Sequence, residues 1–239
     1  MLMVDVTIAG MRYRPLLGLL CAAAATPSMA ASGTDRNTRE IFKNFTECIV
    51  GKHPKEAAAV VLSETHSTEI MRHHPDLITA DCLHADQLQI PGGEFVLYGF
   101  AEALLRREYA NGLPADIAQA APLEHKSVEP QLQPGKRLGA RELAAIEKDA
   151  KEANALRALS IYAECVARSD PAVALKLVLA DPGSSKETSA FVALQPALSS
   201  CLDKGATITL DKAAVHGAIA LNLYRLAKAP RVAASAAAK

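Results

Sequence analysis

Apolar positions recur at helical spacing along most of this chain, and the elements they predict come in the same order twice. In the first half, one face of a helix is marked by Ile41, Phe45, Cys48 and Ile49. Pro54 suits the start of the next helix, because the first turn of a helix leaves backbone N–H groups unused. The helices expected in this half begin near residue 35 or 37, cover 54–63 and, less regularly, 64–80, and end with 94–109.

The second half repeats this order. Its expected helices cover 139–168, a short segment that begins at Pro171, 185–198 and 211–227. The run of charged residues that opens the first of these predicts a solvated face. The last helix matches its counterpart in the first half at a constant offset of 118, so that Val215, Ile219 and Leu223 correspond to Leu97, Ala101 and Leu105.

The residues around the cysteines are repeated as well. Phe45-Thr-Glu-Cys48 corresponds to Tyr162-Ala-Glu-Cys165, a proline follows each at the same spacing, and each copy closes on a Cys-Leu pair. We therefore predict two tandem, similar helical modules at 31–109 and 139–229. Residues 110–138, with four prolines, are predicted to form a linker or surface excursion, and 230–239 a flexible tail.

The composition supports an all-α fold class. The 239 residues are 50% hydrophobic and 22% charged, which is enough apolar side chain for a core. Aromatic residues make up only 4% and Trp is absent, so the core is built from Ala, Leu and Val and suits closely packed helices. Lys and Arg together number 26, as do Asp and Glu. This neutrality argues against nucleic acid as a partner, since phosphate binding needs clustered positive charge.

The amino terminus predicts a secretory signal peptide over residues 1–30. Arg12 and Arg14 precede a short apolar run at 16–25, and Ser28-Met29-Ala30 places small residues at a cleavage site. The run is too short to cross a bilayer, so we expect no transmembrane segment in the mature chain and a periplasmic or secreted location. A buried amino-terminal helix is one alternative, and a lipoprotein signal at Cys21 is another, although Leu20 stands where lipidation signals have a small residue. Translation from Met11 instead of Met1 stays open.

Cleavage after residue 30 would leave four of the five cysteines in a compartment that permits disulfides. Four cysteines allow three pairings, and the repeat favours one bridge within each module, Cys48 to Cys82 and Cys165 to Cys201. On the chain-entropy model, loops of this length stabilise a fold by roughly 3–4 kcal/mol each. Two alternatives to structural bridges are a redox pair and a metal site. The sequence does not favour the redox pair, because Cys-x-x-Cys spacing is missing.

Candidate chemistry is sparse. The one crowded polar stretch contains His66, His73, His74 and His84, which offers a metal-binding alternative for the first module, although the spacing fits no strict ligand motif. We find no Gly-x-Ser-x-Gly, no His-Glu-x-x-His and no phosphate-binding glycine motif, and we assign no catalytic or cofactor-binding residue. Glu47 and Glu164 occupy equivalent positions, and an i,i+4 or capping partner explains them better than acid–base chemistry.

Several of these features resemble a group of uncharacterised secreted proteins of alphaproteobacteria, which carry one or two cysteine-paired units after a signal peptide. The likeness covers 41–107 and 157–226, and its clearest motifs are Tyr162-Ala-Glu-Cys165, Pro182-Gly183-Ser184, Cys201-Leu202 and the helix from His216 to Arg225. The first copy departs from the pattern, because its histidine-rich stretch stands where the Pro-Gly-Ser motif would fall. The resemblance implies an exported bacterial protein and carries over no active-site residue.

These observations predict an exported helical protein that binds or scaffolds an unidentified partner through its helix faces or through the groove between its modules. Two alternatives stay open. One is metal binding by the His66–His84 region, and the other is an enzyme with its site between the modules.

Overall fold

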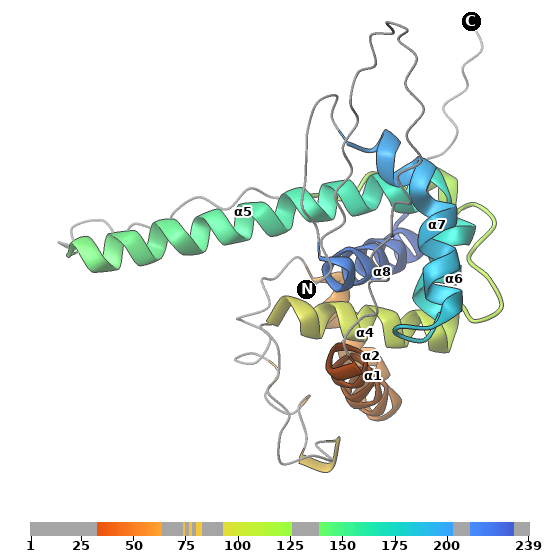
Figure 1. Cartoon of the computed structure of the whole chain (residues 1–239), viewed down its shortest axis with the longest axis horizontal. Helices are drawn as coiled ribbons and strands as arrows, with labels where there is room; N and C mark the ends of the chain where they lie inside the picture. Colours follow the sequence, from red (N-terminus) through yellow and green to blue (C-terminus); the bar gives the residue numbers. More distant parts are fainter. Residues whose placement is uncertain are drawn as a thin grey trace, which may run out of the picture.

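The computed structural model describes residues 33–63, 74, 77, 80–82, 93–125, 139–202 and 211–231. Its elements are α1 (Gly33–Lys52), α2 (Pro54–Leu62), η2 (Ala80–Cys82), α4 (Gly93–Glu108), η3 (Ile117–Gln119), α5 (Ala140–Ser169), α6 (Pro171–Leu179), α7 (Ser185–Ser200) and α8 (Lys212–Lys228). An isolated β-bridge joins Ala120 and Arg231. The predicted all-α class is confirmed, whereas most of the irregular helix expected over 64–80 lies outside the described residues (Figure 1).

Local chemistry accounts for where several helices begin. Pro54 and Pro171 stand in the first turns of α2 and α6, as the sequence predicted. The side chain of Asp170 accepts a hydrogen bond from the N–H of Val173, and Ser184 accepts one from the N–H of Glu187. Such caps satisfy backbone donors that a helix leaves open at its N-terminus. Asp211 does the same for α8.

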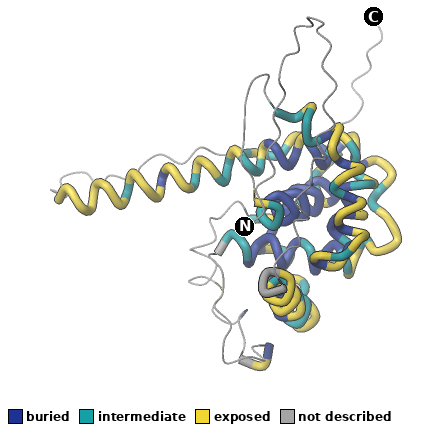
Figure 2. Tube along the Cα trace, viewed as in Figure 1, coloured by how far each residue is buried: buried dark blue, intermediate teal, exposed yellow. Residues whose placement is uncertain are grey.

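α8 lies at the centre of the molecule. It packs against α4, α5 and α6, while α1 and α2 cover α4 and α7 packs on α6. Figure 2 shows α8 and most of α4 as buried, in contrast to the first turns of α5, which extend away from the body and are exposed. The charged residues that open α5 are exposed, as predicted: Glu142, Glu147, Lys148, Asp149, Lys151 and Glu152. Buried residues from both halves of the chain form one hydrophobic core.

Two glycines allow the helices to approach closely. A Cβ atom on Gly217 would lie 2.5 Å from the Tyr98 ring, and one on Gly99 would lie 2.5 Å from the Thr46 methyl group. Both distances are shorter than side chains tolerate, so α8 meets α4, and α4 meets α1, only because a hydrogen atom stands at each position. These glycines are related by the same offset of 118 as the apolar stripes.

Each half also caps a helix of the other half. Arg106 of α4 donates to the carbonyl oxygens at the C-terminal end of α6, those of Val178, Leu179 and Ala180. Arg225 of α8 donates to the carbonyl oxygens of Val61 and Ser63 at the end of α2. Helix C-termini leave carbonyl groups without intrahelical partners, and these guanidinium groups supply them. The two halves therefore form one packed body, and their division into similar modules stays a prediction.

The predicted disulfides are present. Cys48 of α1 joins Cys82 of η2 with a Cα–Cα distance of 5.7 Å, and Cys165 of α5 joins Cys201 at the end of α7 with a distance of 5.8 Å. The sequence separations are 34 and 36. Each bridge therefore ties the first long helix of its half to a segment that stands shortly before the closing helix.

Part of the predicted linker is anchored to the core. Within residues 110–125, Ile117 and Ala120 are buried, and the N–H of Ala121 donates to the carbonyl of Pro230. Residues 126–138, the predicted signal peptide at 1–30 and residues 232–239 of the predicted tail lie outside the described residues. No described helix combines the length and apolar character needed to cross a bilayer.

Candidate functional site

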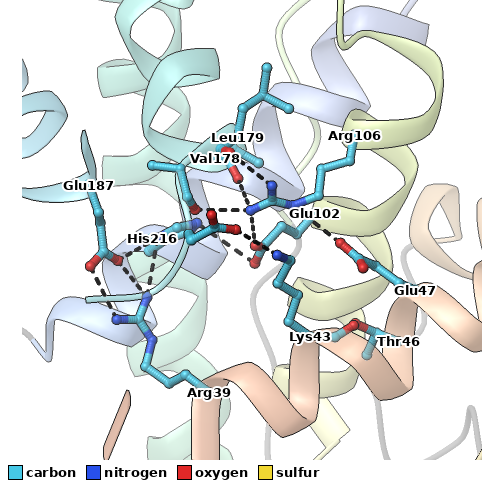
Figure 3. Close-up of polar contacts among 12 residues, drawn as sticks. Arg39, Lys43, Thr46, Glu47, Glu102, Arg106, Val178, Leu179, Glu187 and His216 are labelled. Carbon is cyan, nitrogen blue, oxygen red and sulfur yellow. Dashed lines mark hydrogen bonds and ion pairs between the residues drawn. The ribbon is translucent and has the colours of Figure 1, made fainter. Parts of the chain in front are cut away.

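A pocket with a volume of about 60 Å³ lies where the two halves meet. It is surrounded by α1, α4, α8 and the turn between α6 and α7. Its aromatic lining comes from Phe42, Phe95 and Tyr98. Its charged and ionisable lining comes from Arg39, Lys43, Glu102 and His216, whose contacts are drawn in Figure 3.

His216 is fixed by a carboxylate on one side of its ring. Its Nδ1 atom lies 3.1 Å from Oε1 of Glu187, and the two side chains are only 2% and 0% exposed. Arg39 Nη2, a donor, also lies 3.4 Å from Nδ1, but the contact with Glu187 is shorter. Because a carboxylate accepts hydrogen bonds and does not donate them, we assign a proton to Nδ1. The two residues come from different elements, since Glu187 stands in the first turn of α7 and His216 on the buried α8.

The other ring nitrogen of His216, Nε2, is buried and has no hydrogen-bond partner among the described residues. Oε2 of Glu102 lies 3.7 Å from this nitrogen. This distance is too long for a hydrogen bond. In the neutral Nδ1–H tautomer, Nε2 therefore carries a lone pair at the pocket, next to a carboxylate oxygen that is also an acceptor.

Glu187 is held in its charged form by several donors. Arg39 Nη2 lies 2.6 Å from Oε1, Lys212 Nζ lies 3.2 Å from Oε2, and the N–H of Gly183 donates to Oε2 at 2.9 Å. Burial alone would raise the pKa of Glu187, but the hydrogen bonds from His216, Arg39 and Gly183 and the charge of Arg39 outweigh it and lower the pKa below its usual range. Glu187 therefore stays ionised at neutral pH.

Glu102 and Lys43 have partners outside the pocket. Arg106 Nη2 lies 2.9 Å from Oε1 of Glu102, which leaves Oε2 on the side of His216. Lys43 Nζ lies 2.7 Å from Asp181, and hydrogen bonding and charge from Lys43 lower the pKa of that carboxyl group.

Ion pairs between described residues form a charged cluster around the pocket. Its four basic groups, Arg39, Lys43, Arg106 and Lys212, face four acidic groups, Glu47, Glu102, Asp181 and Glu187.

The four paired cysteines, His74 and the two glutamates that the sequence singled out do not line the pocket. The four cysteines form the two disulfides, and none of them is part of the pocket lining. Of the four histidines, only His74 belongs to the described residues, where it is exposed. Those residues contain no group of three or more His, Cys, Asp or Glu arranged to hold a metal ion.

The two equivalent glutamates behave partly as expected. Glu164 accepts from Arg168, four residues on, at 2.7 Å, and this confirms the local-partner prediction. It also accepts from the N–H of Leu123 and lies 2.6 Å from His125 Nε2, so it anchors the segment before residue 126. Burial would raise the pKa of Glu164, yet these hydrogen bonds lower it. Glu47 instead approaches Arg106 at 3.6 Å, a tertiary contact.

Sequence reasoning missed Arg39, Glu102, Glu187 and His216 as a group. One signal was available for Glu187, because Ser184 and Glu187 have the spacing of a helix capping box, although that motif predicts only a local cap. A second was the polar pair His216 and Asn222 within the mostly apolar stretch 213–224 of the closing helix. Both residues prove to be fully or almost fully buried.

No family model, curated protein or solved structure matches this chain. A functional proposal therefore depends on the pocket and its chemistry.

Proposed function

We propose that this chain is an exported binding protein that holds a small molecule in the pocket between its halves. The observation that carries the proposal is the buried, unpartnered Nε2 of His216 at a cavity. Buried polar groups are almost always hydrogen-bonded, and leaving one unsatisfied costs about 1–3 kcal/mol. A bound ligand that donates to this nitrogen removes that cost.

The lining supports a small-molecule site. Ligand pockets combine apolar and aromatic walls with a few polar groups that fix orientation. Here three aromatic side chains accompany His216 and Glu102. The volume of about 60 Å³ suits the end group of a ligand and not a large substrate.

The proposed export rests on the predicted signal peptide and on the two disulfides. Disulfides persist in oxidising compartments such as the periplasm or the extracellular space and are rare in the cytosol. Peptide mapping of the exported protein tests this part, since a mature chain beginning at residue 31 supports it. A chain that keeps residues 1–30 after export contradicts it.

A fragment screen tests the binding function. We would record amide ¹H–¹⁵N spectra of the oxidised chain with sets of small cationic, anionic and neutral molecules. The proposal expects saturable shifts at α1, α4 and α8 with at least one set, and their loss in His216→Asn. That variant keeps an amide that can donate to Glu187 but lacks Nε2. Shifts scattered over the whole surface, or none with any set, would refute it.

An enzyme is the second candidate, favoured by one specific observation. The carboxylate of Glu187 orients His216, a residue of the pocket lining, and leaves its other nitrogen unpartnered among the described residues, which is the arrangement of a positioned general base. Thr46 also lines the pocket, but its hydroxyl group donates to the carbonyl oxygen of Lys43. Because that proton is already in use, the nucleophile would be a water molecule and not Thr46. Turnover of small esters that disappears in His216→Asn would support this candidate over simple binding.

Metal binding by the His66–His84 region remains a further alternative, and scaffolding through the exposed helix faces another. Equilibrium dialysis with zinc and copper tests the first of these. Uptake of one ion per chain that His66→Ala and His84→Ala remove would support it, and uptake that these changes leave unaltered would end it.

A further inference from the structure

The acceptors of the pocket define what kind of ligand group it takes. We propose that the pocket binds an organic primary ammonium group between Nε2 of His216 and Oε2 of Glu102. This inference rests on the proposed binding function and adds the ligand's chemical class.

Geometry is the first argument. His216 Nδ1 is committed to Glu187, and Glu102 Oε1 is committed to Arg106. The remaining atoms, Nε2 and Oε2, lie 3.7 Å apart, and as two acceptors they do not satisfy each other. Two acceptors at this separation can share a single nitrogen with several N–H groups, because one position can lie at a normal hydrogen-bond distance of about 2.9 Å from both.

Charge is the second argument. Arg39 and Lys43 also line the pocket, but each is bound to a carboxylate at 2.6 and 2.7 Å, Glu187 and Asp181 respectively. An anionic ligand would compete with these partners and would face Glu102. A cationic donor meets one carboxylate oxygen and one lone pair without breaking an existing ion pair.

The walls are the third argument. Phe42, Phe95 and Tyr98 line the pocket, and aromatic side chains attract organic cations that lie over their faces. The polar end of an alkylammonium ion therefore has two acceptors, and its short stem has an apolar surface. A bound water molecule is the alternative occupant, and it would show no preference for a cationic probe.

Three probes with the same carbon chain test the inference: n-butylammonium, butyrate and 1-butanol. We expect n-butylammonium to bind the oxidised chain saturably at neutral pH, at least tenfold more tightly than the other two, and to shift the His216 Nε2 resonance in long-range ¹H–¹⁵N spectra. Glu102→Gln, which keeps the shape and removes the charge, should abolish the preference. Glu147→Gln, on the exposed part of α5, should leave it unchanged.

The outcomes separate the two proposals. If butyrate or butanol binds at the pocket as tightly as the amine, the ammonium inference is wrong while the binding function stands. If none of the three probes binds but other fragments do, the same conclusion holds. If His216 carries protons on both nitrogens in the free protein at neutral pH, Nε2 is a donor to Glu102 and the inference is overturned. If no fragment of any class binds, both proposals fall.

Discussion

Truncation of Glu187 to alanine tests the polar cluster most severely. The side chain is fully buried and accepts from His216 Nδ1, Arg39 and the N–H of Gly183, with Lys212 nearby. Glu187→Ala removes these acceptors, so that the mostly buried guanidinium of Arg39 loses its carboxylate and the buried Nδ1 of His216 faces only that guanidinium, at 3.4 Å. Removing one member of a buried, hydrogen-bonded charge pair costs about 3–5 kcal/mol, so we expect the free energy of unfolding to fall by that amount.

Urea denaturation of the oxidised chain, followed by circular dichroism, measures the change. Glu187→Gln should lose less, about 1–3 kcal/mol, because its amide oxygen still accepts hydrogen bonds. Glu147→Ala on the exposed part of α5 is the matched control and should change stability by no more than about 0.5 kcal/mol. A double-mutant cycle with Arg39→Ala should show coupling, since the two side chains are in direct contact.

The reasoning is refuted if Glu187→Ala costs no more than Glu147→Ala. It is also refuted if the losses for Arg39→Ala and Glu187→Ala simply add, because the ion pair would then contribute nothing of its own. An unchanged denaturant slope is needed for either comparison, as it shows that the variants unfold from a similar native state.

Three further predictions concern pH, packing and capping. Burial would raise the pKa of Glu187, but its hydrogen bonds outweigh burial and lower the pKa in the folded state. The ionised side chain therefore stabilises the fold above the unfolded pKa of about 4.3, and this stabilisation is lost as the pH falls below that value. Urea midpoints should drop less steeply in acid for Glu187→Gln than for the parent. Gly217→Ala should destabilise by about 1–3 kcal/mol, because the new methyl group meets the Tyr98 ring, whereas Gly51→Ala, with nothing within 4 Å, should be neutral or stabilising in thermal melts. Arg106→Lys should not restore the stability lost in Arg106→Ala, since one ammonium group cannot reproduce the guanidinium's contacts with three carbonyls at the end of α6; equal unfolding midpoints for parent and Arg106→Lys would contradict this.

The helices were predictable because their determinants are local. Pro54 and Pro171 set the first turns of α2 and α6 through the chemistry of single residues. The disulfides were predictable for another reason, since the repeat within the chain selected one of three pairings. Glu164 and Arg168 are four residues apart on one helix, and such a pair follows from helix geometry alone.

The site was not predictable because its contacts are distant in sequence. His216 lies 29 residues from Glu187 and 177 from Arg39. No periodicity relates such positions, and only the packing of α1, α7 and α8 brings them together. His216 also stands on a helix that is buried all round, so its polarity does not mark a solvent-facing side, and the sequence pattern alone does not assign it a role.

The predicted linker illustrates the same limit. Its prolines indicate a linker or surface excursion, and the described residues 110–125 contain a short 3₁₀ turn and otherwise irregular backbone. The prolines do not reveal that Glu164 accepts from the N–H of Leu123 and contacts His125, or that Ala120 pairs with Arg231. These contacts join segments that lie 39 to 111 residues apart in sequence, and they depend on the finished fold.

The protonation state of His216 in the ligand-free, oxidised protein tests the central claim most directly. Long-range ¹H–¹⁵N correlation at neutral pH distinguishes a protonated imidazole nitrogen from a bare one. We predict a neutral ring with the proton on Nδ1 and a lone pair on Nε2. A proton on Nε2, in either the imidazolium ion or the other neutral tautomer, would contradict the assignment of this pocket as a site for a hydrogen-bond donor.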